Sequence, residues 1–158
     1  MSSKLITTWT EHDVALKNIL LLAEKDLRIF DDDLVKLKLE RHENAESIRR
    51  FLAAKQQNNV RIVVKNAELL RRDSPRLMKL LMSYPQQMSV VECPPHLASI
   101  SNALCLAGDR HALVRIHQDH ARARIIIDSA PDCTAYLHQF EEIFKEGGEP
   151  ISATTLGL

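Results

Sequence analysis

The sequence is poor in glycine and has no excess of charge of either sign. Its only glycines are at positions 108, 147, 148 and 157, so neither a G-x-x-x-x-G-K-[ST] loop nor a G-x-G-x-x-G loop is present. The 21 basic and 21 acidic residues cancel, so no overall field attracts the chain to nucleic acid or to an anionic membrane. These absences argue against nucleotide-dependent enzymes that use such loops, and we expect no strong nucleic-acid binding.

Cysteine and long apolar runs are also scarce. Cys93, Cys105 and Cys133 are odd in number and widely spaced without a CxxC pair, which is typical of reduced, buried thiols rather than a disulfide framework or a zinc site. No apolar run is longer than that from Ile19 to Ala23, so we expect no membrane span and no signal for export. The sequence predicts a cytoplasmic protein with no metal and no cofactor.

The composition that remains is that of one globular domain. The chain has 158 residues, of which 45% are hydrophobic and 27% are charged. We find no internal repeat and no linker. We therefore expect residues 1–158 to form a single domain, with its core over about 10–146 and a C-terminal tail over 147–158.

Apolar spacing alternates between helical and strand periods along the chain. Helices are expected to begin near Thr10, Asn44, Ser74 and Ser129, and strands are expected over 27–30, 60–64, 88–92, 103–107, 112–116 and 124–128. This order predicts an α/β fold with a single mixed β-sheet flanked by helices. The first strands, joined through helices, should be parallel, and the pair around Gly108-Asp109 should be antiparallel.

Over about residues 10–146 this layout resembles one half of a phospholipase D-like protein. It has parallel βαβ units, then a strand where that family carries its HxKxxxxD signature, a turn, a further strand and a closing helix. It is similar to the small bacterial type of this domain, which is found alone or appended to GNAT-type acetyltransferases. In active members, the resemblance implies, the His attacks phosphorus, the Lys binds the phosphate and the Asp orients the His.

The signature itself is degenerate in this chain. In the best register Asn102 stands in the His position, Leu104 in the Lys position, and only Asp109 matches. An amide cannot form a covalent phosphoryl intermediate, and leucine offers no charge to a transferring phosphate. A second register, with His120, Arg122 and Asp128, has one residue too many before the acid, which would reverse the face of that acid on a strand. We therefore do not expect phospholipase D chemistry.

The other polar clusters can be explained by ordinary structural roles. His111, His117, Asp119 and His120 could ligate a metal, but HxxH alone is a weak signal and an exposed loop accounts for it.

Three further patterns are weaker. Asp31-Asp32-Asp33 follows a strand and could hold Mg²⁺ or Ca²⁺, but a capping loop is the favoured interpretation. Cys93 with His96 could form a nucleophilic pair, but a buried structural thiol is favoured. Ser99 and Ser101 belong to no G-x-S-x-G elbow.

One basic cluster is a candidate anion site. Arg71, Arg72 and Arg76 surround Ser74 where a helix is expected to begin. Backbone N–H groups, the helix dipole and the guanidinium groups together favour a phosphate or a carboxylate. The favoured interpretation is a solvated face in which these arginines pair with an acid such as Asp73.

The sequence therefore favours a catalytically degenerate phospholipase D-like binding or structural module, with a possible small anionic ligand. The alternatives are an acetyltransferase-associated domain or a phosphodiester hydrolase with a displaced site. The chain itself lacks the [RQ]-x-x-G-x-[GA] turn of an acetyltransferase. We also expect a homodimer, in which a tail carrying Ile151, Leu156 and Leu158 docks on apolar surface.

Overall fold

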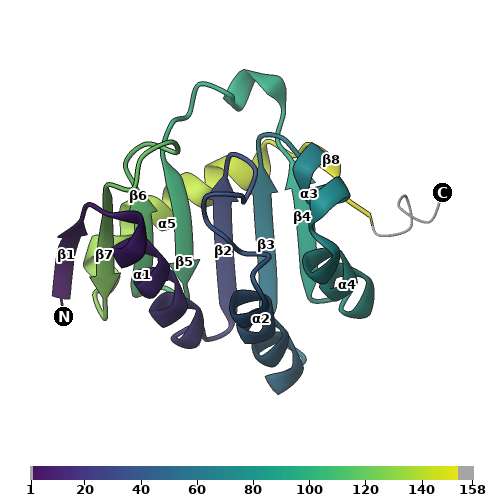
Figure 1. Ribbon diagram of the computed structural model, residues 1–158, viewed down its shortest axis with the longest axis horizontal. Coiled ribbons are helices and arrows are strands. Elements are labelled where there is room, and N and C mark those ends of the chain that lie inside the picture. The colour runs from purple at the N-terminus through teal and green to yellow at the C-terminus, as the bar shows by residue number, and fades with distance from the viewer. Residues whose placement is uncertain (1, 153–158) are drawn as a thin grey trace.

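The computed structural model describes residues 2–152, which form one mixed sheet with helices on both faces (Figure 1). In these residues the sheet has eight strands, in the order β1-β7-β6-β5-β2-β3-β4-β8. The strands are β1 (Ser2–Ile6), β2 (Asp26–Asp31), β3 (Asn59–Val64), β4 (Met88–Glu92), β5 (Ala103–Ala107), β6 (His111–Arg115), β7 (Ala123–Ile127) and β8 (Glu149–Pro150).

The helices form two layers. They are α1 (Trp9–Leu21), α2 (His42–Ala54), α3 (Glu68–Asp73), α4 (Pro75–Ser83), the 3₁₀ turn η1 (Pro95–Leu97) and α5 (Ala130–Lys145). Figure 1 shows α1, α2 and α4 on one face of the sheet and α5 crossing the other. We call these the α1 face and the α5 face.

The directions of the strands confirm the predicted fold class. β2, β3 and β4 are parallel and are joined through helices, as a crossover connection requires. β5 runs antiparallel to both β2 and β6. The β5–β6 connection is a loop of three residues, Gly108 to Arg110, because Ala107 pairs with His111. Gly108 has a φ of +64°, which glycine adopts without strain.

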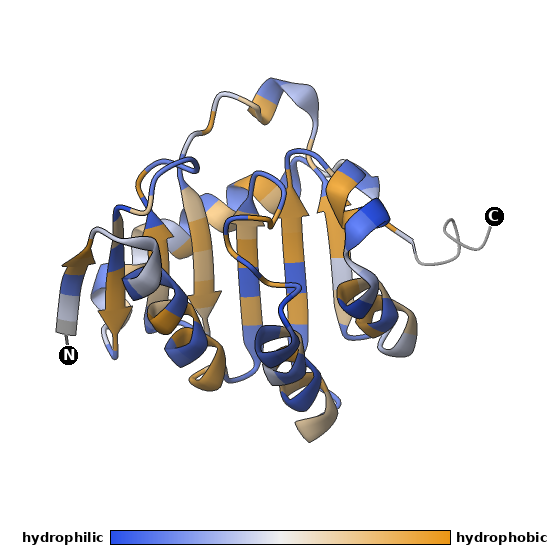
Figure 2. Cartoon of the chain, in the orientation of Figure 1, coloured by the Kyte–Doolittle hydropathy of each residue, from blue (hydrophilic) through white to orange (hydrophobic). Residues whose placement is uncertain are grey.

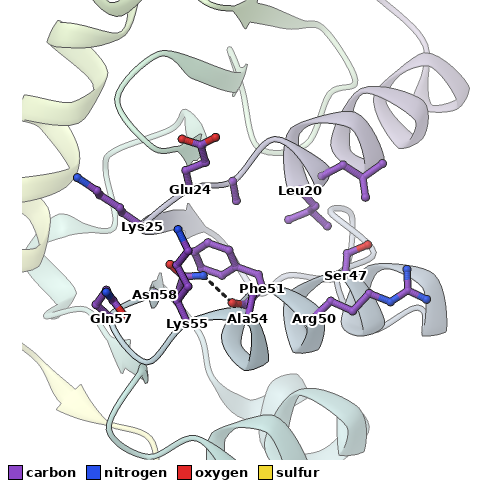
Figure 3. Close-up of a pocket in the computed structure, with 12 residues that line it drawn as sticks. Leu20, Glu24, Lys25, Ser47, Arg50, Phe51, Ala54, Lys55, Gln57 and Asn58 are labelled. Atoms are coloured by element: carbon purple, nitrogen blue, oxygen red, sulfur yellow. Dashed lines mark hydrogen bonds between the residues drawn. The ribbon is translucent and has the colours of Figure 1, made fainter.

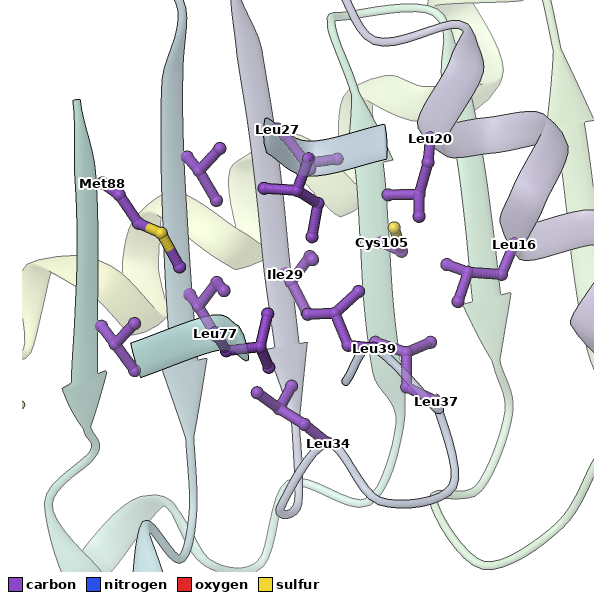
Figure 4. Close-up of a cluster of buried hydrophobic side chains, with 14 of the residues drawn as sticks. Leu16, Leu20, Leu27, Ile29, Leu34, Leu37, Leu39, Leu77, Met88 and Cys105 are labelled. Atoms are coloured by element: carbon purple, nitrogen blue, oxygen red, sulfur yellow. The ribbon is translucent and has the colours of Figure 1, made fainter. Parts of the chain in front are cut away.

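Apolar side chains from successive strand residues fill the two faces in turn. Leu27 and Ile29 of β2 pack on the α1 face together with Leu16 of α1, and the loop before α2 adds Leu37 and Leu39 (Figure 4). On the α5 face, a separate cluster is formed by side chains that include Phe30, Leu104, Leu106, Phe140 and Ile143. Burial on both faces explains why the central strands are mostly apolar in Figure 2, although blue bands interrupt β2 and β3.

Three short elements were not predicted from the sequence: β1, α3 and β8. β1 is mostly polar, and of its residues with described side chains only Ile6 is buried, so alternation gives little signal. β8 pairs with β4, and Ile151 just beyond it is buried and donates its N–H to the Val90 carbonyl at 2.8 Å. Ile151 thus docks on its own chain, whereas Leu156 and Leu158 lie outside the described residues.

Candidate functional site

The residues that the sequence register matches to the phospholipase D signature lie along β5 and on the loops at its two ends. Asn102 precedes the strand and is half-buried, and Leu104 is only 2% exposed, packed in the cluster beneath α5. Asp109 lies in the hairpin loop beyond the far end of the strand, 3.6 Å from Arg110 Nε. Because all of β5 separates Asp109 from Asn102, this acid cannot orient a group at position 102. The matched spacing therefore brings no catalytic pair together.

Asn102 makes a reciprocal pair with Gln139 of α5. Its Nδ2 donates to Gln139 Oε1 at 3.0 Å, and Gln139 Nε2 donates to Asn102 Oδ1 at 2.9 Å. Each amide satisfies the other's donor and acceptor, so the pair is neutral and holds β5 to α5. Neither group titrates or acts as a nucleophile on phosphorus.

A lysine that the sequence analysis missed completes this end of the α5 face. Lys65 follows β3, and its Nζ donates to the Ala98 carbonyl and to Gln118 Oε1, each at 2.9 Å. Gln118, which is buried, donates its Nε2 to the Asn102 carbonyl at 3.2 Å. Lys65 could have been found from its position directly after a parallel strand, because polar residues that follow such strands meet at one edge of a sheet. We call Lys65, Asn102, Gln118 and Gln139 the polar end.

A buried ion pair lies near the same sheet end, on the α1 face. Asp31, the last residue of β2, accepts a hydrogen bond from Arg115 Nη2, and both side chains are 2% exposed. Burial raises the pKa of Asp31, and the Arg115 charge and a backbone N–H oppose that rise. Arg115 also lies over the Trp9 ring at 5.6 Å. The Asp31 carboxylate is therefore paired with Arg115 and is not available to bind a metal cation.

His12 of α1 packs beside this ion pair. Its ring meets that of Trp9 edge-on at 5.3 Å, and its buried Nδ1 has no hydrogen-bond partner in the described part of the chain. Burial and the nearby Arg115 charge lower the pKa of His12 from 6.5 to about 4. His12 is thus a neutral core histidine.

The second signature register is not assembled. His120 lies in the loop before β7, and Asp128 follows the far end of β7, where its Oδ1 accepts from Arg110 Nη1 at 3.0 Å. Arg122 is exposed on the same loop as His120. The strand β7 separates the acid from the other two residues.

The histidine cluster is only partly brought together. His117 and His120 have ring centroids 5.1 Å apart, and Asp119 is held by Lys36 at 2.7 Å. His111 lies at the opposite end of β6, where its Nδ1 accepts from the Asp128 N–H. Across residues 2–152, no three His, Cys, Asp or Glu side chains form a group able to hold a metal ion.

The acidic run caps its own loop, as favoured from the sequence. Asp31 Oδ2 accepts from the Leu34 N–H at 3.2 Å, and Asp33 Oδ1 accepts from the Val35 N–H at 3.0 Å. The carbonyl of Asp32 accepts from Lys65 and from Asn66. These bonds fix the loop after β2.

Cys93 and His96 do not form a nucleophilic pair. Burial raises the pKa of the Cys93 thiol, whereas a reactive cysteine needs a lowered one. His96 Nε2 lies 2.7 Å from Glu146 Oε1 at the end of α5. Cys105 and Cys133 are buried too, and all three cysteines are free. Ser99 and Ser101 are exposed in the loop before β5.

The expected anion position at the start of α4 holds a side chain of the protein itself. Glu40 accepts from the backbone N–H of Arg76 at 2.9 Å and from that of Leu77 at 3.0 Å. Arg72 pairs with Asp73 at 3.2 Å, and the Ser74 side chain makes no capping bond. An external anion would have to displace Glu40, so binding of an anion here stays a prediction.

Comparison with protein families identifies a match over residues 8–152. The chain belongs to the family described as a domain of unknown function (DUF7931). No curated protein matches this DUF7931 chain. None of the helices between residues 2 and 152 has the length and hydrophobicity to cross a membrane.

Solved structures show what the DUF7931 fold is similar to. Nuc from Salmonella typhimurium, a phospholipase D family member, matches with a TM-score of 0.66 at 11% identity, over 96% of this chain and 98% of that one. NucT from Helicobacter pylori matches with a TM-score of 0.58 at 9% identity, over 94% and 98%. The fold of this chain is therefore phospholipase D-like.

A third neighbour is not described as a phospholipase. The archaeal chromatin protein TrmBL2, whose structure shows a novel mode of DNA binding, matches with a TM-score of 0.68 at 10% identity. This chain spans about half of TrmBL2, since the match covers 94% of this chain and 54% of that one.

Proposed function

We propose that this chain is a phospholipase D-like binding module that has no phosphodiesterase activity. The observation that carries the proposal is the Asn102–Gln139 amide pair, with bonds of 3.0 and 2.9 Å, at the residue that the sequence register matches to the catalytic histidine. Leu104, which the same register matches to the phosphate-binding lysine, is 2% exposed in the core beneath α5. A lysine there would have to bury its charge or displace the helix.

Hydrolysis of bis(p-nitrophenyl) phosphate in the presence of EDTA tests the catalytic part. We expect the wild type, Asn102→Ala and a protein-free blank to release nitrophenol at the same rate. Metal-independent turnover that Asn102→Ala abolishes would overturn the proposal. Turnover that survives in Asn102→Ala would instead support the alternative of a hydrolase with a displaced site.

The proposed ligand is a small anion at Arg71, Arg72, Ser74 and Arg76. Glu40 competes for this position because it already accepts from two N–H groups of α4. Glu40→Gln should therefore strengthen the binding of inorganic phosphate, measured by calorimetry, and Arg76→Gln in that background should abolish it. Phosphate heats that are the same in all three proteins would remove this site from the proposal.

Self-association belongs to the same proposal. A single unit spans nearly the whole of Nuc and NucT. The resemblance to the phospholipase D family implies that an active half-size member builds its site from two copies. Light scattering at micromolar concentration should give twice the chain mass of 18.0 kDa. A mass equal to one chain would reject the homodimer. Because Ile151 docks on its own chain, deleting residues 153–158 tests the rest of the tail.

A nucleic-acid-binding module is the second candidate, favoured by the similarity to TrmBL2. The zero net charge argues against it, since nucleic-acid affinity rests largely on cationic contacts to phosphates. A duplex DNA retardation assay at low and physiological salt separates the two. Association with an acetyltransferase is a further proposal, tested by co-purification with an acetyltransferase encoded beside this chain.

A further inference from the structure

A hollow of about 460 Å³ lies at the end of the sheet opposite the polar end (Figure 3). It forms where the C-terminal ends of α1 and α2 meet the turn that leads into β2. Leu20, Leu21 and Phe51 contribute apolar side chains to its wall, and Lys25, Arg50 and Lys55 contribute cationic ones. The volume is in the range of small-molecule sites, about 300–1,000 Å³.

The cationic side chains of this hollow are not all neutralised by the protein. Arg50 is within 3.3 Å of Glu46 Oε2. Lys25 and Lys55 have no ion-pair or hydrogen-bond partner for their ammonium groups in the portion of the chain that the structure describes. Glu24 is the one acid in the lining. The rim therefore has two uncommitted positive charges above an apolar wall.

Lys25 is also held in a backbone conformation that lysine disfavours. Its φ is +63°, in the left-handed region that glycine and asparagine adopt at lower cost. The Lys25 carbonyl accepts from the Asn59 N–H at 2.8 Å, a bond that any residue at this position can make. The turn needs the conformation but not a lysine side chain, so that side chain needs another explanation.

A second hollow of about 450 Å³ adjoins the first and shares Glu24 and Lys25 with it. Its lining adds Arg28 and Arg110 together with Asp26 and Asp109. Both arginines are ion-paired, Arg28 with Asp26 at 3.4 Å and Arg110 with Asp128 at 3.0 Å. The protein itself therefore balances the charges of the second hollow, and the uncommitted positive charge lies in the first.

We propose that this hollow binds a small amphipathic anion, whose phosphate or carboxylate head is held by Lys25 and Lys55 and whose apolar body lies against Leu21 and Phe51. Leu21, which is 69% exposed, would be covered by such a ligand. The proposal involves no covalent step. It does not depend on the anion site proposed at the start of α4, because the two sites share no residue.

Hexyl phosphate, inorganic phosphate and hexanol, titrated separately by calorimetry, test both halves of the ligand. We expect hexyl phosphate to bind at least tenfold more tightly than either of the others. Lys25→Asn should weaken hexyl phosphate binding at least tenfold, while the midpoint of thermal unfolding stays equal to or above that of the wild type. Lys25→Arg should keep the affinity within threefold, and Leu21→Gln should weaken hexyl phosphate but not inorganic phosphate.

Lys79→Asn is the matched control, since Lys79 is an exposed lysine on α4 outside this hollow. It should leave the affinity unchanged. The proposal is overturned if hexyl phosphate does not bind at millimolar concentration, if Lys25→Asn binds like the wild type, or if Lys79→Asn loses as much affinity. Phosphatidic acid vesicles distinguish the source: co-sedimentation that depends on Lys25 assigns a lipid headgroup, and binding of hexyl phosphate alone assigns a free metabolite.

Discussion

At one end of the sheet, the two faces carry different kinds of polar pair. On the α1 face, Asp31 and Arg115 form an ion pair in which both side chains are 2% exposed. On the α5 face, Asn102 and Gln139 form a neutral, half-buried amide pair. Asn102 and Leu104, the positions that the sequence register matches to the phospholipase D His and Lys, lie on the α5 face and carry no charge. The two fully buried charges lie on the α1 face, where they join β2 to β6.

The cost of burial explains why this difference matters for stability. Desolvating two ions costs several kcal/mol each, and only a well-formed pair offsets that cost. The Arg115 side chain is not fully hydrogen-bonded, because its Nε and Nη1 have no hydrogen-bond partner within residues 2–152. The Trp9 ring, 5.6 Å away, supplies part of the compensation. Breaking the Asp31–Arg115 ion pair should therefore lower the free energy of unfolding much more than breaking the Asn102–Gln139 amide pair.

The largest expected effect is that of Arg115→Met. It leaves the Asp31 carboxylate buried and without its counter-ion, and we expect the free energy of unfolding to fall by about 3–5 kcal/mol. Urea denaturation followed by circular dichroism measures this change. The double variant Asp31→Leu with Arg115→Met should recover most of the loss, because both charges are then gone. If the double variant is less stable than Arg115→Met, the ion pair is not the source of the effect.

The next effect is a loss of stability in acid that depends on His12. The pKa of His12 is about 4 in the folded protein and 6.5 in the unfolded one, so the unfolded state binds the proton first. The contribution of His12 to stability is fully present above pH 6.5. It is lost as the pH drops from 6.5 towards 4, by about 3 kcal/mol at about 1.4 kcal/mol per pKa unit. Asp13, Lys38, Asp31 and Arg115 are the charged groups around this ring or its neighbours.

His12→Phe isolates that contribution. Phenylalanine keeps a ring against Trp9 and cannot take up a proton. Urea midpoints measured between pH 4 and 7.5 should therefore fall less steeply in the variant than in the wild type. Parallel curves for the two proteins would show that His12 does not titrate with a lowered pKa.

Much of the fold was predictable because burial on two faces leaves a strong signal. The apolar runs at 60–64, 88–92 and 103–107 correspond to β3, β4 and β5 within a residue at each end. β1 and β8 were missed because edge strands need not be apolar: the carbonyl and N–H groups of β7 and β4 hold them. α3 was missed since a helix of six residues has too few periods to show spacing.

The polar groups were less predictable than the strands. Arg115 follows Val114 and precedes Ile116, and nothing local shows that it pairs with Asp31, 84 residues away. The Asn102–Gln139 pair likewise joins residues 37 apart. Local sequence pattern reports which face a residue occupies, whereas the identity of its partner depends on how distant strands and helices come together.

A smaller loss is expected for Asn102→Leu. It removes both hydrogen bonds to Gln139 and leaves that amide half-buried without its partner, so stability should fall by about 1–2 kcal/mol. Chemical denaturation is again the measurement. Asn102→Leu combined with Gln139→Leu should lose less than Asn102→Leu alone, since replacing both partners leaves no amide unsatisfied. A loss as large as that of Arg115→Met would remove the distinction between the two faces.

The smallest effect is expected for Arg61→Met, on the same face as the amide pair. The Arg61 side chain is 19% exposed, with its Nη2 2.7 Å from Glu141 Oε1 and its guanidinium 4.8 Å above the Phe144 ring. Water reaches Glu141, so the ion pair is screened and the cation–π contact adds only modestly; methionine keeps the aliphatic packing. We expect a loss of about 1 kcal/mol at low salt and a smaller loss at 1 M NaCl, because salt screens an exposed pair.

Glu141→Gln should lose less than Arg61→Met, since the ring contact survives. A loss that salt does not reduce would mean that Arg61 is as dry as Arg115, and the contrast between the faces would then rest on the polar end alone.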